Sequence, residues 1–301
     1  MRGVFCRTLL NFSSNPEFVF LTGDLGFMSL EPLREAMDRR FINAGVAEQN
    51  MVGVAAGLAK SGLRPWAYSI APFLYARSFE QIRNDVCLHR LPVVLVGNGG
   101  GYGYGVMGST HHALEDYGVL LSLPHMRAYI PAFDSDLECM IPKLMRIDHP
   151  AYLRLGLSEQ PTWLRPGGYA PWRRILPGNG PTAVFTGPLV GANIAAIREA
   201  GLDADVWLVS ELPIGQPPAE FLTSVRRSGY LLAVEEHVAA GGLGQMVAHA
   251  LLTAGVSPAR FVHRSALGYV SGLYGSQRFH REECGLDPAS MVAELGLAAH
   301  P

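Results

Sequence analysis

The chain has few charged residues, no long apolar run and no closely spaced cysteines. Charged residues make up 17% of the 301 residues and the net charge is -2, which excludes the basic surface that nucleic acids and anionic membranes attract. No apolar run approaches the ~20 residues that span a bilayer, and the first residues show no signal-peptide pattern. We therefore expect a cytoplasmic protein with neither nucleic-acid nor membrane partners.

The four cysteines, Cys6, Cys87, Cys139 and Cys284, are widely separated. No pair has the spacing of a metal site or a redox motif, so we expect reduced thiols. Apolar residues make up 49% of the chain, as in globular proteins, and the length suffices for two domains. A low charged fraction also suits a surface that is buried against another subunit.

Short β-rich runs alternate with helical patterns, which is typical of doubly wound, mostly parallel sheets. The first strands are predicted at 18–23, 39–45, 65–70, 92–99, 126–132 and 150–156, with helices at 46–61, 73–88, 112–122 and 134–146. After a Pro- and Gly-rich stretch, strands follow at 182–187, 205–210, 230–237 and 261–267, with helices at 189–200, 218–227 and 243–254. The sequence predicts an α/β protein with two doubly wound domains, 1–160 and a smaller 181–301, joined by a linker over 161–180.

One carboxylate, Glu48, lies at the start of a helical segment that follows Gly45. Apolar and small residues lie all round this segment, so we predict that the helix is buried between layers. A buried carboxylate is costly unless something pairs with it. From the residues alone, Glu48 either accepts hydrogen bonds from free N–H groups of the first helical turn or faces a ligand nitrogen.

A glycine-rich segment follows the predicted strand at 92–99. Its residues Gly103, Gly105 and Gly108 match the dinucleotide fingerprint G-x-G-x-x-G. The glycines begin too early for a tight strand-to-helix turn, however, and no acidic residue ends the next predicted strand. A stand-alone nicotinamide enzyme therefore remains only as an alternative.

The segment from Arg40 to Val86 contains a strand, a Gly-x-x-Glu turn into a helix, a second strand and an aromatic stretch that ends in Glu-Gln-Ile-Arg. It resembles the pyrimidine-binding domain of transketolase-type thiamine diphosphate enzymes. A weaker resemblance extends over nearly the whole chain, and residues 233–251 and 274–292 are similar to the closing domain of that family. The resemblance implies a thiamine-diphosphate-binding (pyrimidine) domain followed by a transketolase C-terminal-like domain.

The resemblance also implies how this chain would bind the pyrimidine ring. Glu48 would bond a pyrimidine ring nitrogen and promote the imino form of the cofactor, which requires a poorly solvated carboxylate facing the ring. Phe73, Ile70 and Tyr68 would form the apolar shelf beneath the ring, although an aromatic residue is usual in the family at the position of Ile70. From the residues alone, Phe73 could equally be a core aromatic.

The glycine-rich segment corresponds in the resemblance to the active-site element Gly-x-x-Gly-x-Thr-His, here Gly105, Gly108, Thr110 and His111. His111 would act on the substrate, as a hydrogen-bond donor or as a proton carrier. His112 is a second candidate substrate contact. The two adjacent histidines could also be metal ligands, but no third ligand lies at a suitable spacing.

The chain departs from the family where the substrate binds. Transketolases usually have Glu-Asp before Gly-x-Thr-His, whereas this chain has Val106 and Met107, so Met107 would lie beside the substrate. The family also commonly has a histidine earlier in this loop that contacts the substrate phosphate. This chain lacks that histidine and has Gly99 near its place. Arg154 remains as a candidate phosphate or carboxylate ligand, because a guanidinium suits either group.

The Gly-Asp-Gly element that holds the metal and the diphosphate in this family is missing, so this chain is predicted to bind no metal itself. The resemblance implies a partner chain that supplies the diphosphate-binding domain with a Mg or Ca ion, in a heterotetramer with two copies of each chain. We therefore expect a two-component thiamine-diphosphate-dependent transferase. It would move a two-carbon, ketol or acyl, unit to an atypical acceptor.

Three alternatives remain at this point. One is a β subunit of a 2-oxo acid dehydrogenase, or a deoxyxylulose-phosphate-synthase-like enzyme, with pyruvate as donor. Another is a non-catalytic scaffold, and the third is the nicotinamide enzyme. For His237, in the second domain, a structural role is expected rather than a catalytic one.

Overall fold

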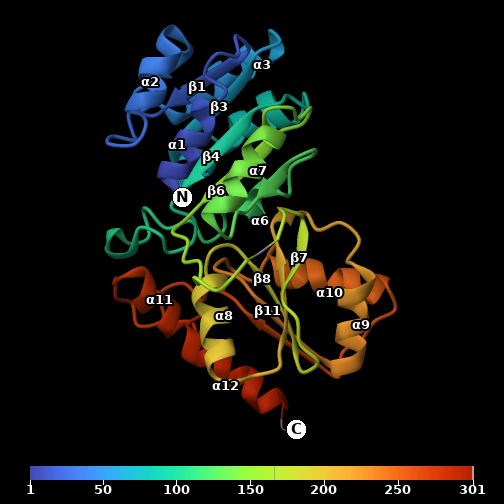
Figure 1. Cartoon of the computed structure of the whole chain (residues 1–301). Coiled ribbons are helices and arrows are strands. Elements are labelled where there is room, and N and C mark those ends of the chain that lie inside the picture. The colour runs from blue at the N-terminus through green and yellow to red at the C-terminus, as the bar shows by residue number, and fades with distance from the viewer. Residues whose placement is uncertain (166, 300–301) are drawn as a thin grey trace.

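The computed structural model describes residues 1–165 and 167–299. They form two α/β lobes, with the first half of the chain in one lobe and most of the second half in the other (Figure 1). The sheet of the first lobe has seven strands in the order β10-β5-β6-β4-β3-β1-β2, and the sheet of the second lobe has five in the order β12-β11-β8-β9-β7. The predicted α/β fold class is thus confirmed.

The first sheet is parallel except at one edge. Its strands are β1 (Phe18–Thr22), β2 (Phe41–Asn43), β3 (Arg64–Ile70), β4 (Val94–Asn98), β5 (Arg127–Tyr129), β6 (Ala151–Leu155) and β10 (Glu211–Leu212). Short β10 comes from the second half of the chain and pairs antiparallel with β5. Every residue of β1 is buried, as expected for a parallel strand that helices cover on both faces.

Helices cover the two faces of this sheet separately. One face carries α3 (Glu48–Lys60), α4 (Ala71–Tyr75), α5 (Phe79–Gln81), a π-helical stretch (Ile82–Cys87) and α6 (Asp116–Leu120). The other face carries α1 (Arg2–Leu10), α2 (Glu31–Met37) and α7 (Asp134–Leu144), and a short 3-10 turn, Asp38–Arg40, leads into β2. Of these, α1 and α2 were not predicted from the sequence.

The second sheet begins inside the segment that was predicted as a linker. Strand β7 (Trp172–Leu176) pairs antiparallel with β9 (Asp205–Val209), so the prediction of a linker over 161–180 is wrong for these five residues. The other strands are β8 (Thr182–Thr186), β11 (Tyr230–Val234) and β12 (Arg260–Arg264). The helices are α8 (Val190–Glu199), α9 (Ala219–Ser228), α10 (Leu243–Thr253), α11 (Gln277–Glu283) and α12 (Pro288–Ala299).

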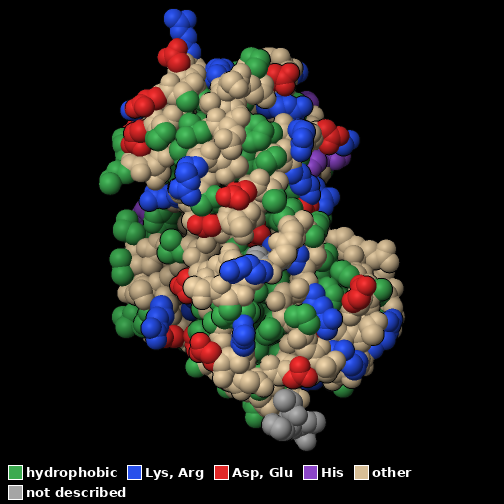
Figure 2. Space-filling model, viewed as in Figure 1, with side chains coloured by type: hydrophobic (Ala, Val, Ile, Leu, Met, Phe, Trp, Pro, Cys, Tyr) green, Lys and Arg blue, Asp and Glu red, His purple; other side chains and the backbone are tan. Residues whose placement is uncertain are grey.

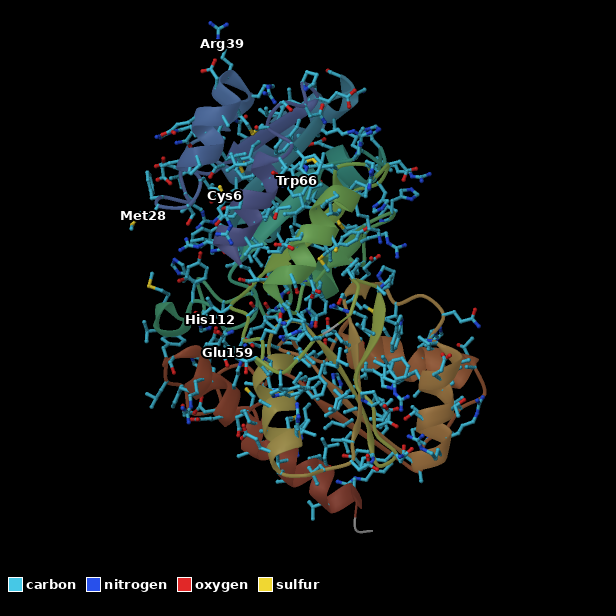
Figure 3. All side chains as sticks on the ribbon, viewed as in Figure 1. Cys6, Met28, Arg39, Trp66, His112 and Glu159 are labelled. Atoms are coloured by element: carbon cyan, nitrogen blue, oxygen red, sulfur yellow. The ribbon has the colours of Figure 1, made fainter. Side chains whose placement is uncertain are left out.

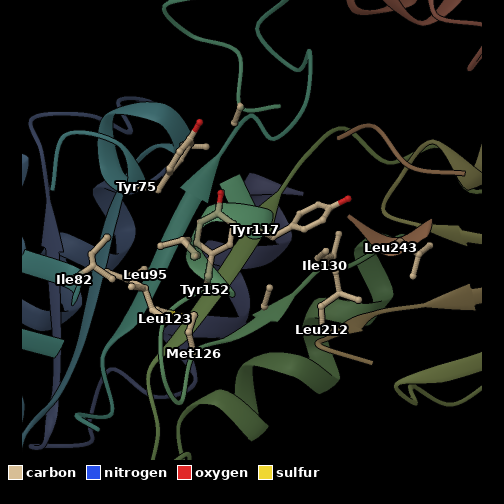
Figure 4. Close-up of a cluster of buried hydrophobic side chains, with 14 of the residues drawn as sticks. Tyr75, Ile82, Leu95, Tyr117, Leu123, Met126, Ile130, Tyr152, Leu212 and Leu243 are labelled. Atoms are coloured by element: carbon tan, nitrogen blue, oxygen red, sulfur yellow. The ribbon is translucent and has the colours of Figure 1, made fainter. Parts of the chain in front are cut away.

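A continuous apolar core joins the two lobes. Leu212 and Leu243, from the second half of the chain, belong to the same buried cluster as Ile130 and Tyr152 of the first lobe (Figure 4). Burial of apolar surface at this junction stabilises the pair of lobes against separation. The loops at the junction are therefore held by both halves of the chain.

Two predicted helices differ from those observed. Helix α3 is not buried all round, because Val54 is 39% exposed and Gln49, Asn50 and Gly57 face solvent. The helix predicted over 73–88 is interrupted, since α4 ends at Tyr75 and α5 begins at Phe79. At this break the hydroxyl of Ser78 donates to the carbonyl of Leu74, a contact that competes with helical hydrogen bonding.

Within the described residues, no helix is both long enough and apolar enough to cross a membrane. The face seen in Figure 2 carries basic and acidic side chains interspersed among apolar and polar ones over both lobes.

Candidate functional site

The carboxyl ends of the parallel strands meet at one edge of the first sheet. Strand β1 pairs with β2 on one side and with β3 on the other, and β3 pairs with β4, so the connections that leave β1 and β3 run in opposite directions. Open α/β sheets bind ligands at such a reversal, outside the carboxyl ends of the strands. Glu48 follows β2, Phe73 follows β3 and His111 lies in the loop after β4.

Glu48 is the first residue of α3 and only 4% exposed. Its carboxylate is paired with a side chain, a partner that neither alternative from the sequence included: Nη1 of Arg77 donates to both of its oxygens, at 3.1 and 3.2 Å. The Arg77 guanidinium also lies over the ring of Phe73, with Cζ 3.8 Å from the ring centroid. Glu48 and Phe73 therefore hold a flat N–H donor between them.

The surroundings of Glu48 fit a further polar ligand. A Cβ added to Gly23 would lie 3.6 Å from Oγ of Ser69 and 3.8 Å from Cγ of Glu48, so the backbone of Gly23 passes close to both side chains. Ser69 is fully buried, and its hydroxyl has no hydrogen-bond partner among the residues that the structure describes. An orphaned buried hydroxyl is uncommon in proteins and marks a place where a ligand can supply the missing bond.

His111 lies against the same aromatic ring. The rings of Phe73 and His111 are 5.0 Å apart in an edge-on arrangement, and Nδ1 of His111 is 2.9 Å from the Thr110 hydroxyl. The structure thus brings together Glu48, Phe73 and His111, which are far apart in the sequence. Met107 lies in the short 3-10 turn Gly105–Met107 of the same loop and is 55% exposed.

Tyr68 does not belong to this group, which corrects the prediction from the sequence. Neighbouring residues of a strand point to opposite faces of the sheet. Tyr68 packs on the α1 face, where its ring stacks on Phe5 at 6.1 Å. Ile70 ends β3 and is 9% exposed, and its role beneath a pyrimidine ring stays a prediction.

His112 is a structural residue of the loop, not a free substrate contact as predicted. It is 3% exposed and lies at the junction of the two lobes (Figure 3). Nε2 is 2.8 Å from the carbonyl of Gly105, and Nδ1 is 2.9 Å from the Tyr269 hydroxyl. Because a carbonyl only accepts, Nε2 carries the proton and Nδ1 accepts from Tyr269.

Arg154 also turns away from the proposed substrate position. It is 4% exposed, and Nε donates to Asp116 at 2.7 Å. Nη2 donates to the carbonyls of Ala113 and Glu236, at 2.8 and 3.0 Å. With Nε and Nη2 bonded inside the protein, Arg154 joins the lobes and is not retained as a phosphate or carboxylate ligand.

The second lobe holds the glycine-rich loop through Glu236, which sequence reasoning missed. Oε1 of Glu236 accepts from the backbone N–H of Tyr102 at 2.7 Å. Its carboxylate also accepts from Gln277 at 2.8 Å and Arg281 at 2.6 Å. A Cβ on Gly101, at φ +64°, would meet this carboxylate at 2.4 Å, so only glycine allows the close approach.

The loop does not fit dinucleotide binding. The fingerprint requires a strand that turns directly into a helix, but β4 is followed by an irregular loop whose single helical element is the three-residue turn Gly105–Met107. In the part of the chain that the structure describes, no group of three or more His, Cys, Asp and Glu side chains could hold a metal ion.

His237 has a defined neutral tautomer in the interior. Its Nδ1 donates to the carbonyl of Val238 at 2.7 Å, and its Nε2 accepts from the N–H of Gly118 at 3.1 Å. The ring is fully buried and stacks on Tyr117 at 3.7 Å. Burial lowers the pKa of His237 below its ordinary value. A second proton on Nε2 would also break the hydrogen bond from the Gly118 N–H.

This arrangement predicts a loss of stability in acid. The unfolded chain binds a proton on His237 at higher pH than the folded chain, so stability is complete above about pH 6.5 and falls as the pH drops below it. Between pH 6.5 and 5.5 this loss is at most about 1 kcal/mol in free energy of unfolding, and we expect His237→Gln to abolish it, as measured by urea unfolding. The control is His89→Gln, on the surface. Equal pH dependence of wild type and His237→Gln would contradict the assignment.

Comparison with known proteins gives the class of this fold and site. Residues 11–161 match the transketolase pyrimidine-binding domain. The chain is 30% identical to one of the subunits of apulose-4-phosphate transketolase from Phocaeicola vulgatus, over 83% of both chains. It is 32% identical to 1-deoxy-D-xylulose-5-phosphate synthase of Nitratidesulfovibrio vulgaris, over 84% of this chain and 40% of that protein.

A solved structure described as a split gene transketolase in an inactive beta4 tetramer is also similar. The superposition covers 99% of the present chain and 97% of the solved chain, with a TM-score of 0.82 and 30% sequence identity. The chain therefore belongs to the transketolase family, as the resemblance implied, and corresponds to the C-terminal half of a split transketolase-like protein. Membership of this family implies chemistry that depends on thiamine diphosphate.

Proposed function

We propose that this chain is the pyrimidine-domain subunit of a two-component thiamine-diphosphate-dependent transketolase-like enzyme. The enzyme transfers a two-carbon, ketol or acyl, unit to an atypical acceptor. The observation that carries the proposal is the grip of Glu48 and Phe73 on a flat N–H donor beside His111. This grip lies at the reversal point of the sheet, where a ligand is expected.

Each of the three residues has a role that its surroundings support. Thiamine diphosphate, when bound, supplies a nucleophilic carbon that takes up and hands on the two-carbon unit. Glu48 would donate a proton to the pyrimidine ring nitrogen and accept a hydrogen bond from that nitrogen once it is protonated, and Phe73 would support the ring by stacking. His111, half-buried on the loop, is placed to donate a hydrogen bond to a substrate oxygen.

A partner chain would complete the site with the diphosphate-binding domain and a Mg or Ca ion. Large apolar side chains are exposed around the carboxyl edge of the sheet: Phe27 is 69%, Met28 96% and Val46 77% exposed. Met28 points away from the first lobe (Figure 3). Exposed apolar groups of this size favour burial against another chain. We propose a heterotetramer with two copies of each chain.

The substrate loop supports an acceptor less polar than an ordinary sugar phosphate. Residues 99–112 contain neither Lys nor Arg, and Arg154 is committed to Asp116 inside the protein. Val106 and Met107 present exposed apolar surface instead. The loop itself therefore offers a phosphate group no Lys or Arg side chain.

We expect the reconstituted complex to use xylulose 5-phosphate and ribose 5-phosphate poorly, because the loop lacks cations for the phosphates. Enzymes acting on their own substrates typically have kcat/KM values of ~10⁴ M⁻¹s⁻¹ or more. We expect the kcat/KM of the complex for these two sugars to lie at least about a hundredfold below that value. Coupled assay of product formation measures this, with an ordinary transketolase as the positive control. Efficient turnover would contradict the atypical acceptor.

The similarity to 1-deoxy-D-xylulose-5-phosphate synthase favours pyruvate as the second candidate donor. Release of carbon dioxide from pyruvate by the complex, with no activity on ketoses, would select this alternative over ketol transfer.

A further inference from the structure

The side chain of Arg77 contacts both groups that are proposed to bind the pyrimidine. Its guanidinium bonds both oxygens of Glu48 and lies 3.8 Å from the centroid of the Phe73 ring. A guanidinium is planar, carries N–H donors in its plane and stacks on aromatic faces. An aminopyrimidine ring is planar as well and would need the same face of Phe73 and the same carboxylate. Glu48 and Phe73 cannot hold both groups at once.

Little holds Arg77 in this position apart from Glu48. Among the hydrogen bonds of the described residues, Arg77 has no other partner, and its side chain is 46% exposed. Arg77 lies in the break between α4 and α5. The guanidinium can therefore rotate into water without disturbing the core.

Glu48 is in the opposite situation. Its side chain is 4% exposed, and a carboxylate buried in this way is costly without a hydrogen-bonded partner. Arg77 supplies that partner as long as no ligand does.

We infer that Arg77 is an internal placeholder for the aminopyrimidine, which compensates Glu48 in the ligand-free chain and leaves when the cofactor binds. The inference rests on the proposed function and adds a control to the same site. Only molecules in which Arg77 is displaced can bind the cofactor. The apparent affinity therefore equals the intrinsic affinity multiplied by the fraction of molecules in which Arg77 is displaced.

Two measurements on Arg77→Met test the placeholder, because the methionine retains an apolar stem and loses the donors. The first is the thermal midpoint of the chain without cofactor, which should fall as the carboxylate of Glu48 loses its partner. The second is the dissociation constant of the reconstituted complex for thiamine diphosphate with Mg²⁺. This constant should fall about tenfold. That is the gain expected if Arg77 occludes the site in about 90% of wild-type molecules and the variant removes the occluded state.

Arg77→Lys serves as the second variant if the methionine variant folds poorly. A lysine keeps a charge near Glu48 but cannot lie flat on Phe73, so we expect a smaller fall in midpoint and an intermediate gain in affinity. Arg83→Met is the matched control. Its ion pair with Glu80 lies on the surface, with both side chains at least half exposed, and neither quantity should change.

A lower thermal midpoint together with tighter binding of the cofactor identifies a placeholder. Weaker binding by both Arg77 variants would mean that Arg77 helps to hold the cofactor, and a lower midpoint with unchanged affinity would mean a structural ion pair only. Either result overturns the inference while leaving the proposed function in place. Absence of binding by wild type and variants alike would overturn the proposed function and the placeholder with it.

Discussion

Glu48→Gln should lower kcat of the reconstituted complex by roughly a thousandfold, within the range that proton transfer by a positioned side chain contributes to catalysis. A glutamine keeps the size and a hydrogen-bonding oxygen of Glu48 but cannot exchange a proton with the pyrimidine ring. We expect the affinity for thiamine diphosphate to change far less than kcat, because stacking on Phe73 is retained. Steady-state kinetics and cofactor titration measure the two quantities separately.

The matched control for this experiment is Glu80→Gln. Glu80 lies on the same face of the sheet but is exposed and paired with Arg83 on the surface, so its loss should leave kcat unchanged. If Glu48→Gln kept wild-type activity, the carboxylate would have no part in the chemistry. If the wild-type complex were inactive on every donor, a scaffold role would become the better account.

The second large effect concerns stability. Arg154→Met should lower the free energy of unfolding by about 3–5 kcal/mol, because it leaves the buried carboxylate of Asp116 without its cation. Asp116 is fully buried and also accepts from the Tyr152 hydroxyl at 2.7 Å. Burial alone would lower the pKa of Arg154, but the charge of Asp116 raises that pKa overall, so Arg154 carries its charge. Urea unfolding measures the change.

Two further variants make this test specific. Arg90→Met removes an ion pair with Asp148 in which both side chains are more than half exposed, and should cost less than about 1 kcal/mol. Asp116→Asn combined with Arg154→Met should cost less than the sum of the single changes, since the two groups interact directly. An effect of Arg154→Met no larger than that of Arg90→Met would contradict a buried ion pair.

Local sequence patterns were sufficient for much of the fold. The buried runs that became β1, β3, β4 and β8 are short, apolar and bounded by Gly or Pro, so their type could be predicted from composition and length. Strand β10 has only two residues, and it is a strand only because β5 offers it an edge. Such an element depends on tertiary contacts and leaves no periodic signal.

For the site, the resemblance selected Glu48, Phe73 and His111, which the structure brings together, whereas the surroundings of Tyr68 and Arg154 argue against their proposed roles. Tyr68 could have been excluded from the sequence, because large side chains at 66 and 68 alternate with small ones at 67 and 69. Arg154 could not, since its partner Asp116 is 38 residues away in the sequence. Nor did the sequence show that Arg77, four positions after Phe73, lies on its ring and bonds Glu48.

The central claim is that thiamine diphosphate binds where this chain meets a partner that carries the diphosphate-binding domain. Calorimetric titration of the cofactor with Mg²⁺ into this chain alone, the partner alone and their equimolar mixture tests it most directly. The account predicts strong binding only in the mixture, with loss of the signal when the chains are separated. Equally strong binding by either chain alone, or none by the mixture, would contradict it.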